Sequence, residues 1–117
     1  ELWGEYYSIE YTDSLNLSNS GLTGEIPSEI GNLTNLTYLS LSYNELTGLI
    51  PSEIGDLTNL SHLYLNSNQL TGEIPESLCD LNYDFNYGFN ISNNQLCPPY
   101  PSCIEDYVGN QDTSDCD

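Results

Sequence analysis

The residues of this sequence that could support catalysis are one histidine and two serines. His62 is the only histidine, and Ser40 and Ser42 lie one strand away from it in the repeating pattern described below. A serine hydrolase also needs a group that orients the imidazole and donors that stabilise an oxyanion. The pattern places no carboxylate beside His62, and a flat sheet offers no cleft for a glycosidase-type pair of carboxylates. We therefore expect that the chain is not an enzyme.

Carboxylates are the second group that could do chemistry, because they are the only abundant charged side chains. The 117 residues contain 18 Asp and Glu but no Lys or Arg, which gives a formal net charge of −18. The spacing of these acids matches no EF-hand loop, so we expect no metal site and no cofactor beyond weak Ca²⁺ binding. A strongly acidic chain repels phosphate, which excludes nucleic-acid binding through a basic surface. No apolar run is long enough to insert into a membrane.

Four cysteines lie in the C-terminal third of the chain: Cys79, Cys97, Cys103 and Cys116. An even number clustered at one end is typical of two disulfides in an oxidising compartment, whereas zinc favours closer Cys-x-x-Cys spacing. We expect a secreted, extracellular or cell-surface protein. Four cysteines allow three connectivities, and the sequence alone does not choose among them. The chain begins with Glu1 rather than Met, which favours a mature product or an excised segment.

Asn-x-Ser/Thr sequons predict a glycoprotein where the host attaches N-glycans. The five acceptors are Asn16, Asn32, Asn35, Asn59 and Asn90. The competing explanation is that Leu-Thr-Asn-Leu belongs to the repeated sequence of the fold, so sequons arise there whether or not they carry glycans. Asn35 and Asn59 hold the same position in successive repeats, so glycans on them would line one edge of the molecule.

The elements that must position these residues are internal repeats of constant length. Segments 15–27, 39–51 and 63–75 align with one another, and a fourth copy, which includes Phe89, follows after a slightly longer step. Alternation of the type Leu-x-Leu predicts a short strand with its leucines inward, and the Asn after it can form a ladder of side-chain hydrogen bonds through Asn44, Asn68 and Asn94. A repeat of this size cannot bury its own leucines, so each needs a neighbour above and below it.

Residues 36–57 match the pattern Leu-x-x-Leu-x-Leu-x-x-Asn-x-Leu-Thr-Gly-x-Ile-Pro-x-x-Ile-Gly-x-Leu almost letter for letter. The chain thereby resembles the plant-type leucine-rich repeat family over roughly residues 12–101, and it is also similar to secreted bacterial leucine-rich repeat domains. The resemblance implies an α/β solenoid that is right-handed. It would have a short parallel concave β-sheet, 3-10 turns on the convex side, and caps at both ends.

We expect a single domain with three parts: an N-terminal cap over 1–11, four repeats over 12–101 and a disulfide-stapled C-terminal cap over 102–117. Trp3-Gly4 is similar to part of the Trp-x-Gly-Val-x-Cys cap of plant receptors, although both cap cysteines are absent. Residues 94–103 resemble the closing cap Leu-Cys-Gly-x-Pro-Leu of the family, in which the two cysteines pair with each other. The resemblance therefore implies a Cys97–Cys103 disulfide and leaves Cys79–Cys116 as the second.

The side chains between the inward leucines form the predicted concave face, which is polar and uncharged, with aromatic residues on the second and third repeats. An aromatic patch among hydroxyls and amides can bind a peptide or a sugar, although Tyr and Ser are also common on a solvated strand. The predicted binding residues are Tyr38, Ser40, Tyr43, His62, Tyr64 and Asn66.

Two functions fit this sequence. The first is a non-enzymatic extracellular module for protein–protein or protein–glycan contacts that serves as a structural or assembly element of a cell surface or fibril. A repeating contact between the two ends of such a slab would let it associate with itself. The alternative is a stand-alone recognition domain that binds a peptide or polysaccharide on the concave face.

Overall fold

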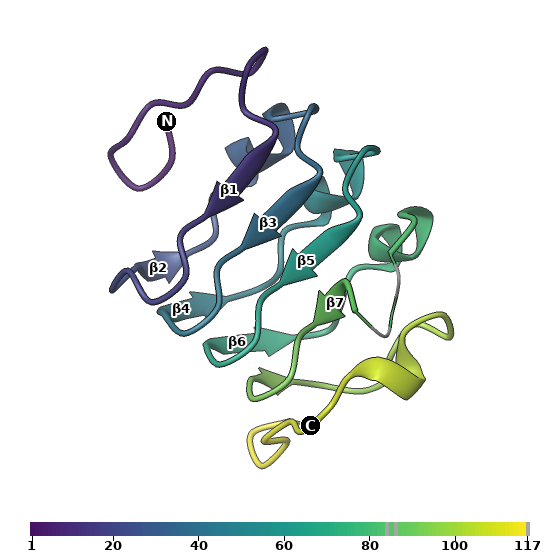
Figure 1. The fold of residues 1–117 in the computed structure, drawn as a ribbon. Coiled ribbons are helices and arrows are strands. Elements are labelled where there is room, and N and C mark those ends of the chain that lie inside the picture. Colours follow the sequence, from purple (N-terminus) through teal and green to yellow (C-terminus); the bar gives the residue numbers. More distant parts are fainter. Residues whose placement is uncertain (84, 86, 117) are drawn as a thin grey trace.

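The computed structural model describes residues 1–83, 85 and 87–116, and its coils are stacked one on another (Figure 1). The molecule measures 39 × 28 × 21 Å along its principal axes. Each coil contributes one strand to a first sheet and one strand to a second sheet, and in the first three coils a 3-10 turn follows the second strand. The solenoid and its class, predicted from the repeat, are confirmed.

The first sheet is parallel, and its strands follow one another in chain order. These strands are β1 (Ser14–Asn16), β3 (Tyr38–Ser40), β5 (His62–Tyr64) and β7 (Phe89–Asn90). The register places Leu15 beside Leu39, Leu39 beside Leu63, and Leu63 beside Phe89. Each of these pairs joins equivalent positions of successive repeats, so the longer step before β7 leaves the stacking register intact.

The second sheet has the same parallel order and leads into the 3-10 turns. Its strands are β2 (Thr23–Glu25), β4 (Glu45–Gly48), β6 (Gln69–Gly72) and β8 (Gln95–Leu96). The turns are η1 (Ser28–Asn32), η2 (Ser52–Asp56), η3 (Glu76–Asp80) and, in the C-terminal segment, η4 (Glu105–Tyr107). A proline precedes each of the first three turns, and its fixed φ suits the start of a helical turn.

Stacking buries the repeated leucines and isoleucines between coils. Leu39, Leu41, Leu46, Leu63 and Leu65 are all 0% exposed. Burying one such side chain contributes about 1.5–3 kcal/mol, and no coil achieves this without its neighbours. The core is therefore one continuous stripe that runs the length of the solenoid.

The predicted asparagine ladder is also confirmed. The Nδ2 of Asn68 donates to the carbonyls of Leu41 (2.9 Å) and Leu65 (3.2 Å), and its Oδ1 accepts from the Leu46 amide (3.1 Å). Asn44 and Asn94 make the equivalent bonds in their coils. One amide side chain thus satisfies backbone groups of two adjacent turns, which would otherwise be buried without partners.

The predicted cysteine pairing is wrong. The disulfides are Cys79–Cys103 and Cys97–Cys116. The Cys79–Cys103 disulfide follows from a close approach that also occurs between earlier coils. A Cβ added to Gly31 would lie 2.8 Å from the Cβ of Glu53, and one added to Gly55 would lie 2.5 Å from the Cβ of Ser77.

The first disulfide continues this close approach between neighbouring coils. Cys79 holds the position that Gly55 holds one repeat earlier, and Cys103 holds the position of Ser77 once the longer last step is allowed for. The Cα atoms of Cys79 and Cys103 are 5.8 Å apart, a normal separation for a disulfide. Cys97 is thereby left to pair with Cys116 in the C-terminal segment.

The N-terminal segment covers only part of the first coil. Leu2 is 3% exposed, whereas Tyr6 and Tyr11 are 83% and 79% exposed. Leu17 and Leu22 are half-buried, although their equivalents in the next two coils are fully buried. The second-sheet side of the first coil is therefore open. The division into caps and repeats at residues 11 and 101 stays a prediction.

Candidate functional site

Three aromatic rings meet on the exposed face of the first sheet, and we call them the aromatic patch: Tyr38, His62 and Tyr64. Tyr38 on β3 lies beside His62 on β5 in the strand register. The ring centroids of Tyr38 lie 5.7 Å from His62 and 5.6 Å from Tyr64, and those of His62 and Tyr64 are 6.3 Å apart. The stacking of coils thus brings together residues that belong to different repeats of the sequence.

Local contacts fix the orientation of two of these rings. The Tyr64 hydroxyl donates to the carbonyl of Tyr87, and the His62 Nδ1 lies 2.9 Å from the Ser61 Oγ. Partial burial, and then the neighbouring Tyr38 phenol, raise the pKa of Tyr64 above its ordinary value. The Tyr64 phenol is therefore a neutral donor at physiological pH.

Two of the predicted binding residues, Ser40 and Asn66, are only 5% and 9% exposed. The Ser42 hydroxyl donates to the Asn66 Oδ1 at 2.7 Å, and the hydroxyls of Ser40 and Ser42 lie 3.3 Å apart. These small polar groups hydrogen-bond within the face. Tyr43 is 63% exposed and has a left-handed φ of 57°, in the turn just after β3. Among the predicted binding residues, the aromatic patch and Tyr43 therefore supply the more accessible surface.

The structure does not assemble the serine and histidine geometry of a hydrolase. Among the described residues, the serine within hydrogen-bonding distance of His62 is Ser61, while Ser42 donates to Asn66. In the same described part of the chain, no three His, Cys, Asp or Glu residues lie close enough together to hold a metal ion. No helix over these residues is long and apolar enough to cross a membrane.

Four of the five predicted glycan acceptors form two structural pairs, and Asn32 stands apart from both. The Nδ2 of Asn35 donates to the Glu10 carbonyl at 2.9 Å, and the Nδ2 of Asn59 donates to the Thr34 carbonyl at 3.1 Å. At Asn16 and Asn90, the side-chain oxygen instead accepts from the amide and hydroxyl of the serine that follows two positions later. Asn32 is exposed on η1. Glycan attachment at these five positions stays a prediction.

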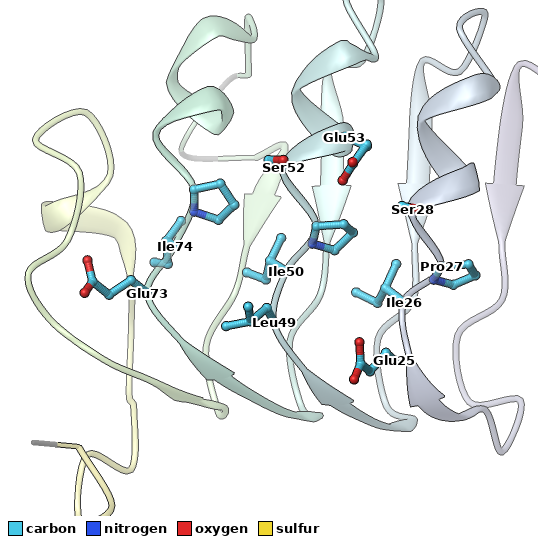
Figure 2. A pocket seen from close by; sticks show the side chains of 12 residues that line it. Glu25, Ile26, Pro27, Ser28, Leu49, Ile50, Ser52, Glu53, Glu73 and Ile74 are labelled. Carbon is cyan, nitrogen blue, oxygen red and sulfur yellow. The ribbon is translucent and has the colours of Figure 1, made fainter.

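A groove that the repeat pattern did not predict lies on another side of the solenoid, where the second sheet passes into the 3-10 turns. This groove has a volume of about 600 Å³ and contains the exposed Leu49, with Glu25 and Glu73 on either side (Figure 2). The sequence carried a signal for it, because Leu49 is apolar at a position that is glutamate in the neighbouring repeats. We call it the outer groove.

Comparison with known proteins agrees with the solenoid of stacked repeats. The family described as leucine rich repeat matches residues 11–70. The chain belongs to the leucine-rich repeat family. A comparison with curated protein sequences gave no match.

Among solved structures, plant receptors are similar to this chain. The plant peptide hormone receptor RGFR1, in complex with RGF2, is 42% identical with a TM-score of 0.67, over 79% of this chain and 14% of that chain. One chain of the BIR3–SERK2 complex from Arabidopsis thaliana is 35% identical to this chain with a TM-score of 0.66, over 75% of this chain and 46% of that chain. The ectodomain of the Arabidopsis thaliana receptor kinase GASSHO1/SCHENGEN3, in complex with CASPARIAN STRIP INTEGRITY FACTOR 2, is 40% identical with a TM-score of 0.64, over 77% and 11%. The chain thus spans less than half the length of each of these relatives.

Proposed function

We propose that this chain is an extracellular, non-enzymatic binding module that recognises a protein or peptide through the aromatic patch and Tyr43. The observation that carries the proposal is the contact of Tyr38, His62 and Tyr64 on one open sheet face, with centroids 5.6–6.3 Å apart. Tyrosines are enriched among the residues that dominate binding energy, because they bury a large rigid surface and keep a polar group.

The surroundings of the patch support a role in binding. The Ser42 hydroxyl and the Asn66 side-chain oxygen hydrogen-bond to each other, and the two phenols and the imidazole can each make one directional contact. Relatives of known structure are found in complexes: RGFR1 with RGF2, and BIR3 with SERK2. Two disulfides are typical of proteins that function in an oxidising environment outside the cell.

The proposal can be tested by selecting a displayed random-peptide library against the disulfide-bonded protein and titrating the enriched peptides. We expect Tyr38→Ala/Tyr64→Ala to weaken their binding at least thirtyfold, since truncating a central aromatic anchor typically costs about 2 kcal/mol or more. The matched control is Tyr6→Ala/Tyr11→Ala, which removes two exposed tyrosines outside the face. Equal affinities for wild type and the first variant would contradict the proposal, as would a preference for oligosaccharides over every peptide.

A second candidate function is end-to-end assembly, favoured by the half-buried Leu17 and Leu22 at the open side of the first coil. Burying them against another copy would complete their packing as in later coils. Since the chain carries a net charge of −18 and no Lys or Arg, association would require screening of that charge. Sedimentation velocity at low and at high NaCl concentration would then show larger particles at high salt, whereas a monomer under both conditions would contradict assembly.

A further inference from the structure

We propose that the outer groove is a second binding site, for an extended protein segment in which an apolar residue is flanked on both sides by Lys or Arg. This site is separate from the aromatic patch. The groove lies where β2, β4 and β6 pass into the 3-10 turns (Figure 2). Three observations carry the proposal: an exposed leucine, a set of carboxylates around it, and the lack of basic residues in the chain.

The apolar element of the groove is Leu49. It follows Gly48 at the end of β4 and is 60% exposed, while the next residue, Ile50, is 2% exposed. Its side chain leans over Gly72 of the following coil, where a Cβ would collide with the Leu49 Cδ2 atom. The absence of a side chain at Gly72 thus leaves the space that the Leu49 Cδ2 atom occupies. The exposed surface of Leu49 can be removed from water only by a partner.

Carboxylates surround this leucine. Glu25 and Glu73 hold the equivalent position in the coils before and after, and both are exposed. The stem of Glu25 lies over Gly48, where a Cβ would be 2.7 Å from the Glu25 Cγ. Glu53 on η2 adds a third carboxylate to the lining of the groove (Figure 2).

Charge complementarity decides the kind of occupant. The chain has no Lys or Arg, so neither this chain nor a second copy of it can place such a cation between these carboxylates. A partner with basic side chains can do so, and the acidic field of the whole molecule would speed its approach. An anionic or neutral apolar segment would bury Leu49 but leave the carboxylates without counter-charges.

The spacing of the coils sets the spacing of the basic residues. Stacked strands lie about 4.8 Å apart, so Glu25 and Glu73, two coils apart, are separated by about 10 Å along the solenoid. An extended chain rises about 3.3 Å per residue, so it crosses the groove in about three residues. Because successive side chains of an extended segment point to opposite faces, Lys or Arg at both of the two positions on each side of the central apolar residue would direct a cation toward the groove on each side of Leu49.

Two labelled peptides test this inference: Gly-Lys-Lys-Leu-Lys-Lys-Gly and the same peptide with Ser in place of Leu. Fluorescence anisotropy at physiological salt would give their affinities for the disulfide-bonded protein. We expect the Leu peptide to bind at least tenfold more tightly than the Ser peptide. Leu49→Ser should remove this difference. The variant Glu25→Gln/Glu53→Gln/Glu73→Gln should weaken binding of the Leu peptide at least tenfold.

The matched control separates the groove from general charge attraction. Glu5→Gln/Glu10→Gln/Glu105→Gln changes the net charge by the same amount at exposed positions outside the groove, and it should lower the affinity less than twofold. Equal losses in the two triple variants, or equal affinities for the Leu and Ser peptides, would overturn the inference. Tyr38→Ala/Tyr64→Ala should leave binding unchanged, so the result does not depend on the proposed function of the concave face.

Discussion

Gln111 repeats, on the last coil, the hydrogen bonds that Asn94 makes one coil earlier. Its Nε2 donates to the carbonyls of Ile91 and Val108, both at 2.8 Å, and its Oε1 accepts from the Leu96 amide at 3.0 Å. A parallel bridge joins Asn94 to Gln111. The C-terminal segment therefore extends the ladder beyond the last repeat and satisfies backbone groups that would otherwise end it.

Replacing Gln111 with Ala should destabilise the protein by about 2 kcal/mol, because it leaves the Leu96 amide and the Ile91 carbonyl without these partners. Urea unfolding followed by circular dichroism would measure the loss. The control is Asn110→Ala, since the cited contact of Asn110 uses its backbone carbonyl, which accepts from the Asn93 amide. Equal stabilities of Gln111→Ala and wild type would show that the ladder ends at Asn94.

Because Gly55 lies close to Ser77, the loss of stability caused by Gly55→Ala should depend on whether the Ser77 side chain is present. Gly55→Ala alone should cost about 1–3 kcal/mol, because its new Cβ would lie 2.5 Å from the Ser77 Cβ. In the Ser77→Gly background the same change should cost at least about 1 kcal/mol less, since the Ser77 Cβ and Oγ are gone and only the backbone carbonyl oxygen, 2.9 Å from the new Cβ, still crowds it. A double-mutant cycle by urea unfolding measures this coupling. Additive effects of the two substitutions would contradict the register described for these coils.

The two disulfides predict which cysteine pairs can form alone. Cys97→Ser/Cys116→Ser retains Cys79 and Cys103, which are held 5.8 Å apart between Cα atoms, so it should refold in a glutathione buffer with no reactive thiol. Cys79→Ser/Cys116→Ser retains Cys97 and Cys103, which belong to different disulfides. This variant should therefore keep two reactive thiols. Thiol titration under native conditions distinguishes these results. The reverse result would support the pairing implied by the family's closing cap.

Burial of Tyr83 predicts a loss of stability at high pH. Burial raises the pKa of Tyr83, and its hydroxyl has no hydrogen-bond partner among the described residues. The unfolded chain therefore loses this proton first as pH rises through about 10, so the stabilising contribution is complete below about pH 10 and falls above it. Tyr83→Phe should match or exceed wild type at pH 8.

The advantage of Tyr83→Phe over wild type should grow by up to about 1.4 kcal/mol per pH unit above about pH 10. Guanidinium unfolding at pH 8, 10 and 11, with disulfides kept oxidised, measures it. Tyr6→Phe is the control, because Tyr6 is 83% exposed. A difference between Tyr83→Phe and wild type that does not change with pH would contradict the assigned shift.

The fold could be predicted because the residues that stabilise it recur at a constant spacing along the chain. Leu39 and Leu63 mark the inward positions of adjacent strands, and Asn44 and Asn68 mark the ladder, so period and residue type together determined the register. The aromatic patch followed directly, since Tyr38 and His62 hold the same position in successive repeats. The low exposure of Ser40 and Asn66 did not follow, because it depends on how side chains of adjacent coils cover one another.

The remaining differences lie where the repeat changes or ends. Gln111 comes sooner after Asn94 than Asn94 comes after Asn68, so a search at the period of the repeat does not find it. The cysteine pairing was carried over from a family cap, although the equivalent positions of Gly55 and Cys79 already indicated the close approach that joins Cys79 to Cys103. The outer groove does not follow from the repeat, because Leu49 departs from the glutamate that the neighbouring repeats have at its position.

Neighbouring coils cover one another's leucines, and this stacking creates the open face of the first sheet. Amide hydrogen exchange by NMR tests it most directly. The amides of Leu41 and Leu65 donate to carbonyls of the next coil, Tyr64 and Asn90, both at 2.8 Å. We expect the amides of Leu41 and Leu65 to exchange only through global unfolding. The amide of the exposed Tyr6 should exchange near the rate of an unfolded peptide. Fast exchange at Leu41 and Leu65 in the oxidised protein would contradict the stacked solenoid.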